Sequence, residues 1–232
     1  MLTDIFSSFD PATNSIFNSL PSPMFWFMNF LFISLLSASF WLSPSRLFNM
    51  ISSPKMIMHE QSLRTFGSHM KGFTPMISSL FLLIIITNLT GLLPYIFSVS
   101  SHLFFTLTLA LPLWLSLIIS SAATSPMKFL AGILPGGAPS WLNPFLVLIE
   151  TTSISVRPIT LSFRLAANMS AGHIVLGLIG IYSASALFTS MTSFMSLLAI
   201  QIMYIMFEIG ICLIQAYIFC LLLTLYSDDH SS

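Results

Sequence analysis

The C-terminal part of the sequence is one long apolar stretch, which runs from residue 141 almost to Tyr226. Serine and threonine collect between Ser183 and Ser193, and we expect the stretch to fold back there into two antiparallel helices. A helix of about 20 apolar residues crosses a bilayer, so each of these helices would be nearly twice as long as a perpendicular crossing needs. The segment 141–226 is therefore predicted to be a long hairpin that tilts strongly, bends or runs partly along the membrane.

Shorter apolar runs fill the rest of the chain. An N-terminal segment, 1–23, precedes a first predicted span at 24–42. The segment 43–73 mixes basic and apolar side chains, as is typical of an amphipathic interfacial helix or loop. Two more spans are expected within 74–122. The sequence thus predicts an all-α membrane protein, a single membrane-embedded domain over 1–232 with about five membrane-embedded helices plus an amphipathic interfacial helix.

Charged side chains are too few to cover a surface in water. Of the 232 residues, 56% are hydrophobic and only 6% are Asp, Glu, Lys or Arg, which indicates that the surroundings are the lipid bilayer. The formal net charge is zero and no basic run occurs, so nucleic acid is excluded as a partner. Signatures of nucleotide, dinucleotide and zinc-protease sites are absent, and we expect neither a cofactor nor a metal.

The basic residues predict the orientation of the chain. With five crossings, the basic residues between spans all fall on one side of the membrane, and the positive-inside rule makes that side the inner one. These residues are Arg46, Lys55, Arg64, Lys71 and Lys128. We therefore expect the N-terminus outside and the C-terminus inside.

Five ionisable residues fall within the long apolar stretch: Glu150, Arg157, Arg164, His173 and Glu208. Ionisable groups at membrane depth are costly and are retained mainly for function. The first three are spaced seven residues apart, which places them along one stripe of a helix. Arg164 cannot lose its charge and has no acid three or four residues away. Its partner must therefore come from elsewhere, and another subunit is one source.

The expected hairpin predicts which polar residues of its two helices lie level. Folding near residue 190 puts Gln215 level with Arg164 and Glu208 level with His173, because the mean residue number of each pair is close to 190. Asn168 extends the arginine stripe, whereas His173 lies about 180° around the helix from Arg164.

Structural alternatives stay open for several of these residues. Arg157 is followed by a proline and either snorkels, satisfies Glu150 or has a role of its own. His173 is as consistent with a hydrogen-bonded core histidine as with a proton carrier. Four other histidines are most simply solvated or interfacial, and we assign them no role. They are His59, His69, His102 and His230.

The segment SVRPITLSFRLAANMSAGHIVLGLIG, at 155–180, resembles the signature helix of subunit a of F-type ATP synthases. The motifs TNLTGLLPY, ILPGGAPSWLNPFLVLIE and EIGICLIQAYIFCLLLTLY stand in the order found in that family. The resemblance is strong from Pro75 to Tyr226 and rests on hydropathy alone before that. It implies a proton-conducting stator subunit, not an enzyme by itself, that offers two offset half channels to a rotating c ring. Other membrane and peripheral-stalk subunits would be its further partners.

The same resemblance implies roles for single residues. Arg164 takes the place of the arginine that faces the ring, and Gln215 takes that of the glutamine near it. Asn168 and Glu150 match the family's asparagine and upstream acid. His173 and Glu208 show the exchanged arrangement of the mitochondrial type, which implies the mitochondrial inner membrane, with the N-terminus toward the intermembrane space and the C-terminus toward the matrix. The candidates for the matrix exit are Glu150, Asn168, Asp228 and Asp229.

Two other functions are weighed against this one. A proton-coupled secondary transporter would normally show internal repeats with interrupted helices in corresponding halves, and none is visible. A purely structural membrane scaffold would not need an arginine, a histidine and a glutamate buried in its last two helices.

Overall fold

The computed structural model describes residues 46–93, 96–127 and 141–231, together with the single positions 9, 23, 24, 26, 27, 30, 34, 129 and 133. Most of the predicted span at 24–42 therefore lies outside the described residues. Lys128 lies outside them as well. Every regular element in the described part of the chain is a helix, which confirms the all-α prediction.

Seven helical elements follow one another in the part of the chain that the structure describes. In order they are α2 (Arg46–Leu63), η3 (Phe66–His69), α3 (Phe73–Gly91), η4 (Val99–Ser101), α4 (Leu103–Thr124), α6 (Asn143–Thr189) and α7 (Met191–Ser231). Four of them, α3, α4, α6 and α7, contain windows long and apolar enough to cross a membrane. They fall where the second to fifth spans are predicted, and α2 falls in the predicted interfacial segment.

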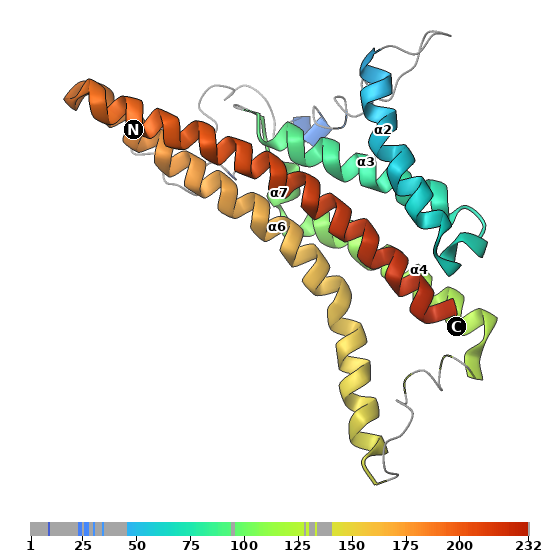
Figure 1. Cartoon of the computed structure of the whole chain (residues 1–232). Coiled ribbons are helices and arrows are strands. Elements are labelled where there is room, and N and C mark those ends of the chain that lie inside the picture. Colours follow the sequence, from blue (N-terminus) through green and yellow to red (C-terminus); the bar gives the residue numbers. More distant parts are fainter. Residues whose placement is uncertain are drawn as a thin grey trace.

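Helices α6 and α7 form the predicted hairpin and lie side by side near its turn (Figure 1). The break between them is Ser190, whose extended backbone (φ −160°, ψ 137°) ends α6 before α7 begins. The fold point predicted near residue 190 is confirmed. The first part of α6, yellow in Figure 1, turns away from α7. Pro158 lies inside this helix and lacks the N–H that a straight helix needs, which is the usual cause of such a bend.

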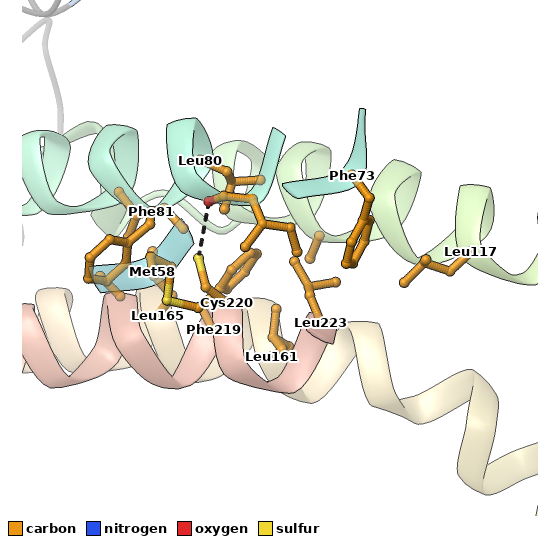
Figure 2. Close-up of a cluster of buried hydrophobic side chains, with 14 residues drawn as sticks. Met58, Phe73, Leu80, Phe81, Leu117, Leu161, Leu165, Phe219, Cys220 and Leu223 are labelled. Atoms are coloured by element: carbon orange, nitrogen blue, oxygen red, sulfur yellow. Dashed lines mark hydrogen bonds between the residues drawn. The ribbon is translucent and has the colours of Figure 1, made fainter. Parts of the chain in front are cut away.

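The buried core lies between α3 on one side and α6 with α7 on the other (Figure 2). Phe219 and Leu223 of α7 pack there with Phe73 and Phe81 of α3, and the Cys220 thiol approaches the Ile77 carbonyl oxygen at 3.9 Å. This packing holds the second half of α7 in place against α3, so the polar residues of the hairpin are carried on a fixed support.

Polar contacts join the basic N-terminal elements to the end of α7. The Gln61 side chain both donates to and accepts from the Tyr217 hydroxyl, at 2.9 and 3.1 Å. The Phe66 backbone N–H donates to the Asp228 carboxylate at 2.7 Å. A Cβ at Gly67 would overlap the Ser227 hydroxyl, so η3 approaches α7 as closely as only glycine permits. These contacts keep α2 and η3 beside the C-terminal end of α7.

We expect Phe219→Ala to destabilise the protein by about 3 kcal/mol, because the emptied core site loses its packing contacts. Phe104→Ala is the matched control, since Phe104 is 77% exposed on α4 whereas Phe219 is 1% exposed. Unfolding in detergent micelles, followed by circular dichroism, measures the difference. Equal loss of stability in both variants would contradict the assignment of the core to this face of α7.

Candidate functional site

Arg164 lies near the middle of α6, 21 residues after Asn143 and 25 before Thr189. Leu161 and Leu165 of the same helix are buried in the core, and this packing turns Arg164 outward, where it is exposed. The exposed surface beside it is apolar, with Phe163 51% exposed. Within the described residues, no carboxylate lies within ion-pair distance of its guanidinium. The sequence predicted that the partner of Arg164 comes from outside its own helix, and the other described helices offer no carboxylate partner either.

The amides of Asn168 and Gln215 face each other behind this exposed surface. Asn168 Nδ2 donates to Gln215 Oε1 at 3.1 Å, and Gln215 is buried. The prediction placed Gln215 level with Arg164. The Gln215 amide instead meets Asn168, one helical turn after Arg164 and nearer the turn of the hairpin. Side chains lean toward the N-terminus of their own helix. In an antiparallel pair, Gln215 therefore leans toward the hairpin turn and Arg164 leans away from it.

Glu208 lies inside the hairpin, between α7 and α6, with only 2% of its surface exposed. The Tyr204 hydroxyl donates to its Oε1 at 3.0 Å, and its Oε2 has no partner among the described residues. A Cβ at Gly172 would overlap this carboxylate, so glycine at that position makes the room for it. His173 directly follows Gly172, which confirms the prediction that Glu208 lies level with His173.

His173 is half-buried on α6, and its ring meets the Phe9 ring edge-on with centroids 6.2 Å apart. Its Nε2 is buried and has no hydrogen-bond partner in the described part of the chain. No hydrogen bond between His173 and Glu208 occurs among the described residues, so a proton passing between them needs a bridging group.

A second group of charges lies toward the other end of α6. Arg157 forms an ion pair with Glu150, with Nη2 and Oε1 3.8 Å apart, and its guanidinium lies over the Tyr226 ring, 5.0 Å from the centroid. The interpretation that Arg157 satisfies Glu150 is therefore supported. Asp228 accepts the hydrogen bond from Phe66, and the side chain of Asp229 lies outside the described residues.

Two polar residues of this region escaped the sequence analysis. Asn88 of α3 is fully buried, and neither amide atom has a partner within the described residues. His102, interpreted as solvated or interfacial, instead packs against the Trp26 and Phe97 rings, with centroids 5.6 and 5.0 Å away. Burial lowers the pKa of His102, and a hydrogen bond with the Phe9 backbone opposes this effect. For Asn88 the signal was present, since a lone amide in an apolar run needs an explanation.

The fold and these groups define the class of protein: a polytopic helical membrane protein whose long hairpin carries titratable residues on both sides of an arginine that has no ion-pair partner among the described residues. The family model described as ATP synthase A chain matches residues 22–228. ATP synthase subunit a of Aedes albopictus is 39% identical to the chain, that of Drosophila melanogaster 40% and that of Locusta migratoria 37%. Each match covers 230 residues and 99% of both chains.

The chain belongs to the ATP synthase A chain family. It is accordingly a proton-conducting, multi-pass inner-membrane subunit of an ATP synthase, and it is not catalytic by itself.

We expect Gly172→Ala to displace the Glu208 carboxylate and to slow proton conduction, whereas Gly177→Ala on the same helix has open space and leaves conduction unchanged. Both changes gain the same helix propensity, so a difference in stability between the two variants reports the overlap with the Glu208 carboxylate. We expect Gly172→Ala to be less stable than Gly177→Ala by about 1–3 kcal/mol. Unfolding in detergent and passive proton uptake by reconstituted vesicles are the two measurements. If both variants behave alike, Gly172 does not make the room for Glu208.

Proposed function

We propose that this chain is the stationary partner of a rotating c ring, which it meets through the exposed face of α6 that carries Arg164. The observation that carries the proposal is an exposed arginine at mid-helix, on an apolar surface, with no carboxylate partner in the described part of the chain. A cation facing lipid at that depth is expensive. A carboxylate on each ring subunit would offset this cost and would exclude lipid from the arginine.

The proposed route of the proton follows from where the polar residues lie along the hairpin. Glu208 and His173 lie between Arg164 and the turn at Ser190, whereas Glu150 and Arg157 lie on the other side of Arg164. Protons enter past His173 and Glu208 and neutralise a ring carboxylate. They leave past Glu150 and Asp228 after the ring has turned. Arg164, between the two groups, repels protons that would pass directly.

Electrostatics gives each residue a task in this cycle. A protonated carboxyl can face hydrocarbon, whereas the ionised form needs Arg164 beside it. Close to a fixed cation the pKa of a ring carboxyl falls, so an arriving carboxyl releases its proton. Each charge moved across the membrane is worth about 2.3 kcal/mol per 100 mV, which favours one direction of rotation.

The proposed setting is the mitochondrial inner membrane, with the N-terminus toward the intermembrane space and the C-terminus toward the matrix. The relatives are insect ATP synthase subunits, and His173 and Glu208 stand in the mitochondrial arrangement. In this orientation the turn at Ser190 and the start of α4 face the intermembrane space, whereas α2 and Asp228 face the matrix. Other membrane and peripheral-stalk subunits complete the complex.

We expect Arg164→Ala to abolish coupled proton transport, and Arg164→Lys to fail as well because lysine can deprotonate and lacks the planar fork. ATP-driven acidification of membrane vesicles measures the loss. The matched control is Arg157→Lys, which keeps a cation beside Glu150 and should retain most transport. Copurification with the c ring shows that each variant has assembled. Full acidification by either Arg164 variant in an assembled complex would end the proposal.

We expect Glu208→Gln to slow proton uptake without preventing assembly, because glutamine keeps the shape of the side chain and the contact with Tyr204 but cannot exchange a proton. Glu60→Gln, an exposed acid on α2, is the control and should leave uptake unchanged. The rate of proton uptake is measured over a range of pH. An unchanged rate over the whole range would make Glu208 a structural residue.

A further inference from the structure

Phe9 joins the two half-buried histidines of the membrane region, although they lie on different elements. Its ring meets the His173 ring edge-on, with centroids 6.2 Å apart and planes at 88°. Its backbone takes part in a hydrogen bond with His102, the residue that precedes α4. A single aromatic residue of the N-terminal segment therefore lies against both imidazoles.

The surroundings of His102 are unusual for a structural histidine. The ring is held among the aromatic rings of Trp26 and Phe97. Its Nε2 is buried without a hydrogen-bond partner in the described part of the chain, as is the hydroxyl of Ser100 two residues earlier. A histidine that only filled space would normally have both ring nitrogens satisfied, since a buried polar atom without a partner costs free energy.

Packing brings this group close to the polar residues of α6. The 3-10 helix η4, which contains Ser100, packs against α6. A Cβ at Gly91 would lie 3.3 Å from the Met169 side chain and 3.4 Å from Ser98. The Met169 sulfur in turn lies 3.5 Å from the Cys212 thiol, on the α7 helix that also carries Glu208. The end of α3, η4 and the His173 region of α6 are thus one continuous packed unit.

We propose that His102 is a proton acceptor upstream of His173 in the same uptake path, and that Phe9 is the positioning residue that keeps the two imidazoles apart and shielded from lipid. The proposal rests on the proposed function and adds to it a site on a different element, at the start of α4. His173 and His102 each present a buried Nε2 that has no hydrogen-bond partner in the described part of the chain and to which a proton can be delivered.

The electrostatic setting of His102 suits a transient carrier. Burial lowers its pKa, so the ring is neutral at neutral pH and gains a proton only as the outer side becomes acidic. Helix α3 carries no titratable side chain. The titratable groups that the contacts above connect to this unit are His173, through Phe9, and Cys212, through Met169. Glu208 lies against Gly172, next to His173, and accepts the bond from Tyr204. No cation among them opposes the arrival of a proton.

The test uses the assembled complex in liposomes, with proton uptake driven by a potassium diffusion potential and measured as the outer pH is varied. We expect the wild-type rate to rise as pH falls through the pKa of His102, and His102→Gln to lower the rate several-fold and to remove that inflection. His69→Gln is the matched control, because His69 lies in η3 at the opposite end of α7. Its profile should equal that of the wild type.

Phe9→Ala tests the positioning role separately. Removal of the ring takes away the aromatic neighbour of His173 and loosens the segment whose backbone bonds to His102, so the inflection should shift; Phe9→Leu, which keeps an apolar side chain, should shift it less. Should His102→Gln fail to assemble, diethyl pyrocarbonate added from the outer side to the Arg164-intact complex should slow uptake and erase the inflection.

Arg164→Ala in the same liposomes separates the two proposals. If that variant conducts normally, the proposed function is lost. If it is inactive while assembled His102→Gln keeps the wild-type rate and pH profile, only the role of His102 is overturned. A profile that Phe9→Ala leaves unmoved would overturn the positioning role of Phe9 alone.

Discussion

A guanidinium that cannot lose its proton, held at the middle of an apolar helix, is the constraint on which the rest of this structure depends. Arg164 cannot be neutralised, and the described chain offers it no carboxylate. Its cost in lipid would exceed what a single inter-helix hydrogen bond returns. The protein therefore turns it outward by burying the leucines on either side, at 161 and 165, and leaves its charge for another molecule to satisfy. That arrangement is the reason why we propose the face around Arg164 as the interface with the c ring.

Several other polar groups of the hairpin make their contacts away from this arginine. The Asn168 and Gln215 amides satisfy each other, and Arg157 is held by Glu150 and the Tyr226 ring. Glu208 lies deeper, bonded to its own helix through Tyr204 and fitted against the helix backbone at Gly172. Each pairing keeps a potential partner away from Arg164, and the groups nearer the turn are separated from those nearer the start of α6.

Rigid apolar packing gives these groups their positions. Helix α7 carries Phe219 and Leu223 into the core with α3, while its other half carries Glu208 toward α6. The last two turns of α7 are held by η3, through Asp228 and the close approach at Gly67. The hairpin is therefore supported along α7, whereas the first part of α6 bends away from it (Figure 1), and this helix contains Pro158. This support fixes the register between the two polar groups and the arginine.

The sequence by itself determined the helical membrane class, the hairpin with its fold point near 190, and the residues whose charges are too costly to be incidental, because apolar length and ionisation are properties of local composition. It also placed Glu208 level with His173, since that needs only equal rise along two antiparallel helices. It could not decide that Gln215 meets Asn168 instead of lying beside Arg164, because this depends on the direction in which each side chain leans. Nor could it bring Phe9 to two histidines 71 residues apart, 102 and 173, since only tertiary packing brings together residues so distant in the chain.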